Sequence, residues 1–205
     1  AVYSWGWGYY GRLGLGDTNS RDVPTAEPGL EGVVAVEGGW YHSLALGRDG
    51  TLRSWGRNNF GQLGLGDGQN RSSPTVVAGL RRVVDMAGGE NHTIAATLEG
   101  HVYAWGHRCA TGHDAHCHVP TRVTAGLEGV VVVRVAAGQQ HCMAVTQTGQ
   151  LLTWGRGDKG QLGHGRREEE WVPVMVPRAV EGAGGVVGGA RRGTRRWQRV
   201  GPSAL

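Results

Sequence analysis

The sequence has no long apolar run: none approaches the roughly 20 residues that a membrane-spanning helix needs. It has only three cysteines and seven prolines among 205 residues. These counts exclude a disulfide scaffold, and a collagen helix is excluded because glycine does not recur at every third residue. No secretory signal is visible, and an odd number of cysteines fits a reducing compartment. We therefore expect a cytoplasmic or nuclear protein without a membrane contact.

An excess of basic charge is missing from most of the chain. Residues 1–177 hold 15 basic and 16 acidic residues, whereas residues 178–205 hold six arginines and one acid. The sequence pI near 9.3 is therefore a property of the C-terminal segment. A nucleic-acid groove requires basic residues clustered over the folded body. We predict no nucleic-acid binding except through that segment.

Glycine, in contrast, is abundant. The chain has 38 glycines in 205 residues, well above the roughly 7% of ordinary proteins. Glycine adopts positive φ without steric cost, so this content indicates many tight turns. Valine, leucine and eight tryptophans recur along the chain and can bury a core, which argues against disorder throughout.

The glycines belong to an internal repeat of about 50 residues, which is the first feature to seek in such a sequence. Trp-Gly pairs begin at residues 5, 55, 105 and 154, with spacings of 50, 50 and 49. A Gly-x-Leu-Gly motif follows three of them, at 11–14, 61–64 and 160–163. Three further segments carry glycine three residues before a histidine, and these histidines are His42, His92 and His141.

The local patterns predict β-strands. Asp49-Gly50 stands between two short apolar segments, and an Asp-Gly pair suits the turn of a β-hairpin. Residues 33–36 and 83–86 read as buried strands, and a further strand is expected to have Pro74 as its first residue. Four strands per 50 residues is typical of a propeller blade, with a solenoid as the competing repeat architecture.

The combined landmarks (Gly-Gly-x-x-His, Asp-Gly, Trp-Gly and Gly-Gln-Leu-Gly-x-Gly) resemble the regulator of chromosome condensation repeat family. The resemblance covers residues 1 to about 177 and implies an all-β fold, a propeller of seven blades. Three to four blades are present here, as an incomplete arc of repeats at about 1–55, 56–105, 106–154 and 155–177. We expect a fragment of a longer propeller protein, with an arc closed by a second copy as the alternative.

The segment 178–205 departs from the repeat. Gly188-Gly189 keeps the register, but the strand that should follow is rich in arginine, and arginines do not fill a buried strand without partners. We expect a disordered Gly/Arg-rich basic tail. It is either a sequence without a selected role, a solvated linker, or a tail that binds nucleic acid or acidic partners.

The third repeat replaces its Gly-x-Leu-Gly motif by residues rich in histidine and cysteine. Thiolate and imidazole are zinc ligands, and Cys109, His113 and Cys117 are a weak candidate set. Their spacing matches no standard zinc finger, so a variable surface loop is favoured and we predict neither a metal nor a cofactor. The three repeated histidines occupy equivalent positions in separate blades, and we expect them to hydrogen-bond backbone groups in tight turns.

Six residues are candidates for a partner-binding surface, because they vary between the constant glycine and histidine of each repeat. They are Trp40, Tyr41, Glu90, Asn91, Gln139 and Gln140. In the plant ultraviolet-B photoreceptor of the resembled family, similar segments lie on one propeller face at the dimer contact. The resemblance implies one shared face here, although ordinary turn residues would show the same pattern.

The sequence contains no pattern typical of catalysis. No nucleophile elbow is present, and no phosphate loop is completed by Lys-Ser/Thr. We therefore expect a non-enzymatic protein–protein interaction or scaffold module with a protein partner and no small-molecule substrate. The alternative that the resemblance implies is a guanine-nucleotide exchange factor, or its regulator, for a small GTPase. Ultraviolet-B sensing is disfavoured, because only Trp40 occupies the relevant tryptophan position.

Overall fold

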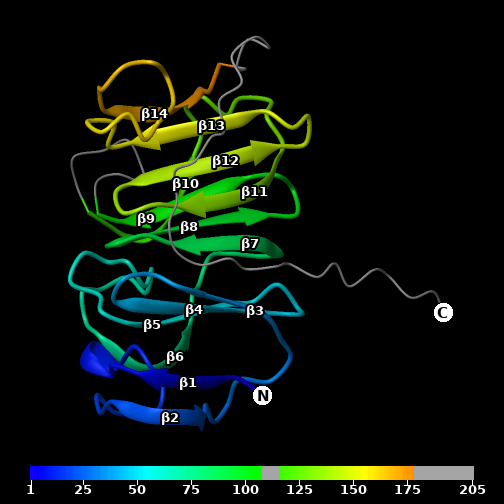
Figure 1. Cartoon of the computed structure of the whole chain (residues 1–205). Coiled ribbons are helices and arrows are strands. Elements are labelled where there is room, and N and C mark those ends of the chain that lie inside the picture. Colours follow the sequence, from blue (N-terminus) through cyan, green and yellow to red (C-terminus); the bar gives the residue numbers. More distant parts are fainter. Residues whose placement is uncertain (108–115, 178–205) are drawn as a thin grey trace, which may run out of the picture.

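The computed structural model describes residues 1–107 and 116–177. In these two ranges every regular element is a β-strand, apart from one short 3-10 turn, η1 (Tyr9–Gly11). The strands form four antiparallel sheets, which are stacked one on the next in chain order (Figure 1). The expected all-β class is confirmed.

The first sheet has two strands and each of the other three has four. The first sheet contains β1 (Tyr3–Gly6) and β2 (Arg21–Ala26). The second contains β3 (Val33–Gly38), β4 (His42–Gly47), β5 (Leu52–Gly56) and β6 (Arg71–Val76). The third contains β7 (Val83–Gly88), β8 (His92–Thr97), β9 (Val102–Gly106) and β10 (Cys117–Val123). The fourth contains β11 (Val132–Ala137), β12 (His141–Thr146), β13 (Leu151–Gly155) and β14 (Glu170–Met175).

Consecutive strands are neighbours in every sheet. A stack of four-stranded meanders is the construction of a β-propeller, in which each sheet is a blade. The sheets are offset from the sequence repeats, because each Trp-Gly pair lies at the end of the third strand of a blade rather than between blades. Three complete blades and half of another make up the incomplete arc that the sequence predicted.

The hairpin predicted at Asp49-Gly50 connects β4 to β5. Gly50 has a φ of 78°, and the Thr51 amide donates a hydrogen bond to Asp49 Oδ1 over 3.0 Å. The expected position of Pro74 was wrong, because β6 begins three residues earlier, at Arg71. The proline is accommodated because β6 is the outer strand of its sheet, where a missing N–H breaks no central ladder.

The core lies between successive sheets, and each interface buries a tryptophan from the later sheet. Trp105 of β9 packs with Leu44, Leu52 and other residues of the second sheet. Trp154 of β13 packs in the same way on the third sheet. Aromatic side chains of this size bury the largest apolar areas, so these tryptophans hold adjacent blades together.

Hydrogen bonds fix the same interfaces. The Trp105 indole donates to the Gln62 carbonyl over 2.9 Å, and the Trp55 indole donates to the Arg12 carbonyl over 2.9 Å. A buried indole N–H needs such a partner. The Gly-x-Leu-Gly segment of one repeat therefore provides the acceptor for the tryptophan of the next, which explains why the two motifs keep a constant separation.

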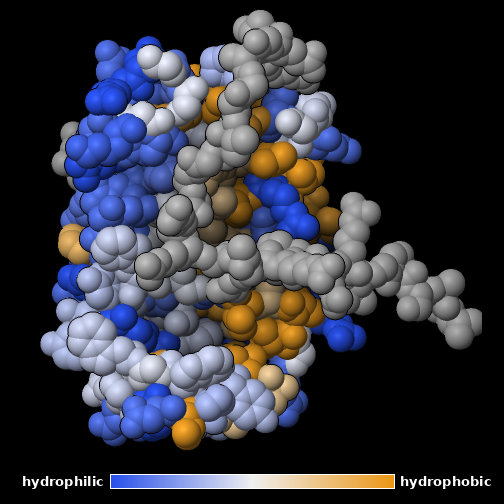
Figure 2. Space-filling view, viewed as in Figure 1, coloured by the Kyte–Doolittle hydropathy of each residue, from blue (hydrophilic) through white to orange (hydrophobic). Residues whose placement is uncertain are grey.

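Hydrophobic side chains also lie exposed on the first strand of each complete blade. They include Val34 and Val36 of β3, Val84 of β7 and Val133 of β11. Hydrophobic surface extends over the middle of the molecule in the view of Figure 2. In the part of the chain that the structure describes, no helix has the length and apolar content needed to span a membrane.

Candidate interaction surface

The turns that end in histidine have one construction in all three complete blades. The amides of Gly39, Gly89 and Gly138 donate to the carbonyls of His42, His92 and His141, each over 2.9 Å. A Cβ added at Gly89 would lie 2.1 Å from Cε1 of His92, so the imidazole packs directly on the glycine. This contact explains why glycine stands three residues before each histidine.

The histidines of these turns stabilise the blades. Thr93 Oγ1 donates to the Gln62 carbonyl over 2.7 Å, so it accepts the 3.0 Å hydrogen bond from His42 Nε2. Burial lowers the pKa of His42 to about 3, and burial lowers that of His92 to about 4, so both rings are neutral at pH 7. The expected partner of His42 was a backbone group; the ring instead binds a threonine hydroxyl of the next blade.

Backbone hydrogen bonds connect the three turns side by side. The Trp40 amide donates to the Gly89 carbonyl, and the Glu90 amide donates to the Gln139 carbonyl, both over 3.1 Å. We call the surface formed by residues 39–41, 89–91 and 138–140, with the segments that follow the Trp-Gly pairs, the turn face. It lies on the left-hand side of Figure 1, at the end where the long loop 156–169 is seen.

The turn face contains all six residues that the sequence singled out. They lie in a row over three successive blades, with their backbones held in one arrangement and their side chains different in each blade. At the position that follows each Trp-Gly pair, Arg57 donates its amide to the Tyr41 carbonyl over 2.9 Å, and Arg156 donates to the Gln140 carbonyl over 2.8 Å. The hydrogen-bonded backbone is thus the same in each blade, whereas the side chains that it displays differ.

One half of the turn face is polar. The side-chain amides of Gln139 and Gln140 donate to Glu90 Oε2 over 3.0 and 3.2 Å. Arg156 in turn binds Gln140 and forms a 2.8 Å ion pair with Asp158. The hydrogen bond from Arg156 is the main reason that the pKa of Asp158 is lowered. The carboxylates of Glu90 and Asp158 thus both accept hydrogen bonds from side chains of this half.

The other half, formed by the first and second sheets, combines arginine and aromatic side chains. We call it the arginine–aromatic cluster, and its members are Trp7, Tyr10, Arg12, Tyr41, Arg57 and Phe60. The guanidinium carbons of Arg12 and Arg57 lie 4.9 and 5.3 Å from the centroid of the Tyr41 ring. Both distances are within the range of cation–π attraction.

Sequence reasoning found Tyr41 but missed the other members of this cluster. The available signal was the residue after each Trp-Gly pair, which varies between blades as Trp7, Arg57, His107 and Arg156. The two residues before Gly-x-Leu-Gly vary in the same way. These positions adjoin the turns only after folding, when Arg57 is bonded to Tyr41.

The candidate metal loop lies largely outside the described residues, since these omit Cys109 and His113. Cys117 is half-buried in β10 and packs against the apolar core between the second and third sheets. Within residues 1–107 and 116–177, no group of three or more histidine, cysteine or acidic side chains could hold a metal ion. The tail 178–205 also lies outside the described residues.

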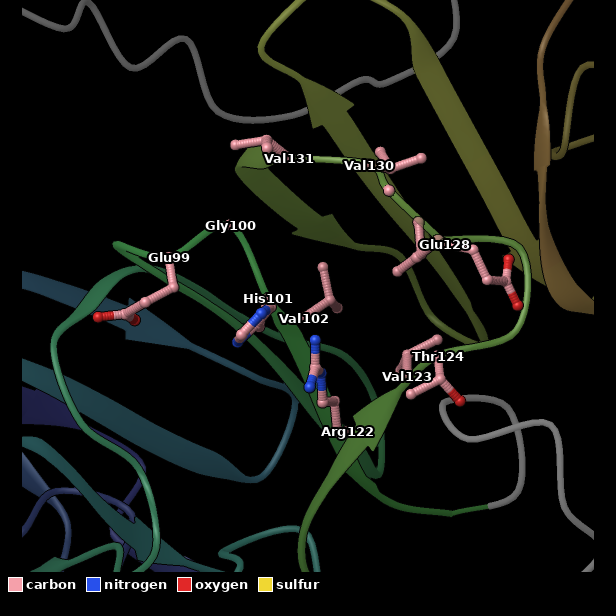
Figure 3. Close-up of a pocket in the computed structure, with 12 residues that line it drawn as sticks. Glu99, Gly100, His101, Val102, Arg122, Val123, Thr124, Glu128, Val130 and Val131 are labelled. Carbon is pink, nitrogen blue, oxygen red and sulfur yellow. The ribbon is translucent and has the colours of Figure 1, made fainter.

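An open pocket of about 370 Å³ lies at the opposite end of the blades from the turn face. Its wall includes His101, next to β9, and Arg122 of β10, with the loop that carries Glu128 and Val130 on the other side (Figure 3). Glu99 on its rim forms a 3.0 Å ion pair with Arg82. The arrangement shows no nucleophile with an adjacent base.

The fold and the turn face together define a class of protein: an open arc of propeller blades that presents variable side chains on a constant frame. Comparison with known proteins gives the family. The family model described as RCC1-like domain matches residues 1–191, and the chain belongs to this family. The resemblance recognised in the repeat motifs is thereby confirmed.

Individual relatives agree with this assignment. The Arabidopsis thaliana ultraviolet-B receptor UVR8 is 43% identical over 53 residues, which are 25% of this chain and 12% of the receptor. The crystal structure of human WBSCR16 superposes with a TM-score of 0.77 at 30% identity, over 85% of this chain and 48% of that one. Yeast RCC1 (Prp20), solved with Kap60, gives 0.70 at 27% identity, over 85% and 44%. This chain therefore spans less than half the length of these solved relatives.

Proposed function

We propose that this chain is a non-enzymatic interaction module of an RCC1-like propeller protein, and that its turn face docks a cytoplasmic or nuclear protein partner. One observation carries the proposal: three successive turns have the same hydrogen-bonded frame but display Trp40-Tyr41, Glu90-Asn91 and Gln139-Gln140. Binding residues are found disproportionately on loops held by a rigid scaffold. Exposed aromatic residues such as Trp40, 51% exposed, are the usual anchors of interfaces.

A double substitution tests the proposal. Changing Trp40→Ser together with Tyr41→Ser is expected to weaken capture of cross-linked partners by about 30-fold, because interface anchors contribute about 2 kcal/mol or more. Quantitative mass spectrometry after chemical cross-linking measures the change. Leu98→Ser is the matched control, since Leu98 is exposed at the opposite end of the blades. Equal capture by the double variant and the control would contradict docking at the turn face.

The second candidate function is guanine-nucleotide exchange on a small GTPase. It is favoured by the similarity to yeast Prp20p, whose crystal structure was described with its binding properties to Gsp1p and histones; the TM-score is 0.71 at 27% identity, over 85% of this chain and 46% of that one. The repeats of this chain follow one another at a near-constant period, with no long insertion of the kind that presses on a nucleotide site. This regularity favours docking over exchange.

A nucleotide-release assay separates the two functions. With a panel of small GTPases loaded with a fluorescent guanine nucleotide, we expect the purified chain to leave the release rate unchanged. Acceleration of any member by about tenfold or more, a change of about 1.4 kcal/mol in barrier height, would establish exchange and contradict a purely docking role. Release by EDTA serves as the positive control for loading.

A further inference from the structure

The arginine–aromatic cluster has a chemistry that indicates what kind of segment it binds. We infer that it receives an acidic, extended segment of a protein partner, with two carboxylates seated on Arg12 and Arg57. The inference rests on the proposed docking function and specifies its partner. It is carried by the stacking of two guanidinium groups around one ring, by their lack of carboxylate partners, and by the restraint of the residues around them.

The two arginines are interleaved with aromatic rings. Arg12 lies 5.5 Å from the centroid of Trp7 as well as beside Tyr41. Arg57 lies 5.2 Å from the centroid of Tyr10 and 5.5 Å from that of Phe60. Stacked rings hold a guanidinium group in one plane and remove water from its faces, while its edges stay directed at a ligand. The cluster is thus organised to present N–H groups.

Neither arginine is neutralised within the described chain. Four other arginines form ion pairs of 2.6–3.0 Å with aspartate or glutamate, namely Arg21, Arg71, Arg82 and Arg156. Arg12 and Arg57 form no ion pair with any described residue. A partly desolvated cation without a counter-charge is costly unless a partner supplies one.

The surrounding hydrogen bonds leave donor groups unused. Arg12 donates to the carbonyls of Tyr9 and Trp40, both over 3.0 Å, so its side chain is fixed to the turn face. Arg12 Nη2 and Arg57 Nε are shielded from solvent, and neither donates to a described acceptor. A carboxylate of a partner would supply the missing acceptor, and hydrogen bonds between two charged groups are stronger than neutral ones.

The backbone beneath the cluster is also restrained. Tyr10 has a φ of 64°, in the left-handed region that tyrosine seldom adopts. In this conformation its ring meets Tyr41 edge-on, with 6.0 Å between the centroids, and also covers Arg57. Strained residues cluster at binding sites because the surrounding structure holds them in place. The preformed cluster lowers the ordering cost of binding.

The spacing of the two guanidinium groups is compatible with two carboxylates of an extended ligand. Since both surround Tyr41 at 4.9 and 5.3 Å from its centroid, their carbons lie at most about 10 Å apart. In an extended strand, side chains on one face recur every ~7 Å, so carboxylates at alternate positions can meet both arginines. A nucleic acid is disfavoured, since binding to its backbone uses many cations and residues 1–177 hold 15 basic and 16 acidic residues.

Fluorescence anisotropy with two labelled synthetic peptides tests the inference. One peptide repeats Ser-Glu, which places all carboxylates on one face of a strand, and the other repeats Ser-Gln. We expect the glutamate peptide to bind the full chain about tenfold more tightly or better, and Arg57→Gln to lose about that factor, as for charge-assisted hydrogen bonds. Arg48→Gln is the control of equal charge change, because Arg48 is exposed on the turn at the opposite end.

Four results would overturn the inference: equal affinity for the two peptides, unchanged binding by Arg57→Gln, tighter binding of a labelled single-stranded DNA that Arg57→Gln abolishes, or equal weakening by Arg57→Gln and Arg57→Lys. Unchanged thermal unfolding of Arg57→Gln shows that the variant is folded. Arg57→Lys retains the charge and is expected to bind more tightly than Arg57→Gln; equal weakening by both would contradict charge recognition. If peptide selectivity is absent while the Trp40 and Tyr41 variant still loses its cross-linked partners, the acidic-segment inference fails and the docking function stands.

Discussion

Replacing Trp105 by alanine is expected to lower the free energy of unfolding by about 3–5 kcal/mol, the range for truncating a large core aromatic residue. Trp105 is fully buried between the second and third sheets, and its indole donates to the Gln62 carbonyl. The substitution leaves a cavity and removes the donor to a buried carbonyl. Urea denaturation followed by circular dichroism measures the change.

Trp5 provides the matched control inside the same chain. It occupies the position of Trp105 two repeats earlier, but the described chain places no sheet before β1 and β2, and Trp5 is 60% exposed. Trp5→Ala is therefore expected to cost less than about 1 kcal/mol, in the range of surface substitutions. Equal destabilisation by the two substitutions would contradict this arrangement of the blades. Trp105→Phe, which keeps most of the volume, gives a measurable intermediate if the alanine variant does not fold.

The contrast between these two tryptophans shows how far the sequence could predict the structure. Constant spacing identified the Trp-Gly pairs, the hairpin turns and the blade type, because each depends on residues close in sequence or on an exact repeat. Burial is different, since it depends on what packs against a residue. Trp5 and Trp105 are alike as sequence positions, and only the stacking of sheets in space distinguishes them.

The sequence likewise predicted only some of the residues of the turn face. The sequence predicted that Trp40, Tyr41, Glu90, Asn91, Gln139 and Gln140 share a face, and the structure places them in one row. The sequence did not predict that the guanidinium groups of Arg12 and Arg57 lie against the ring of Tyr41. Their contact is made between segments 29 and 16 residues away from Tyr41 in the chain, and cation–π attraction depends on distances that a repeat pattern does not encode.

The buried histidines predict a loss of stability in mild acid. The unfolded chain binds protons on His42 and His92 below their ordinary pKa of about 6.5. The folded chain does not, because burial lowers the pKa of His42 to about 3 and that of His92 to about 4. The unfolded state therefore holds more protons as the pH falls, and stability that is fully present above pH 6.5 is lost below it.

The size of this effect follows from proton linkage. Each histidine contributes about 1.4 kcal/mol per pH unit once the pH is below 6.5, so the two together are expected to cost about 4 kcal/mol between pH 7.5 and pH 5. His141 adds to the loss, since burial lowers its pKa too. Carboxyl groups with lowered pKa values, such as Asp67, begin to contribute only at more acidic pH. Burial raises the pKa of Asp85 and Glu27, so substitution of a histidine, rather than the pH interval alone, separates the histidine contribution.

Urea denaturation at pH 7.5, 6 and 5 measures the dependence, and His42→Gln separates the contribution of His42. Glutamine has a side-chain amide nitrogen near the place of the imidazole Nε2, which binds Thr93 Oγ1 over 3.0 Å, and it does not titrate. The variant is expected to be less stable at pH 7.5. The slope of its free energy of unfolding against pH is expected to be smaller, by the amount that corresponds to about one bound proton. A free energy of unfolding that stays constant from pH 7.5 to pH 5 would mean that the rings are protonated in the folded blades.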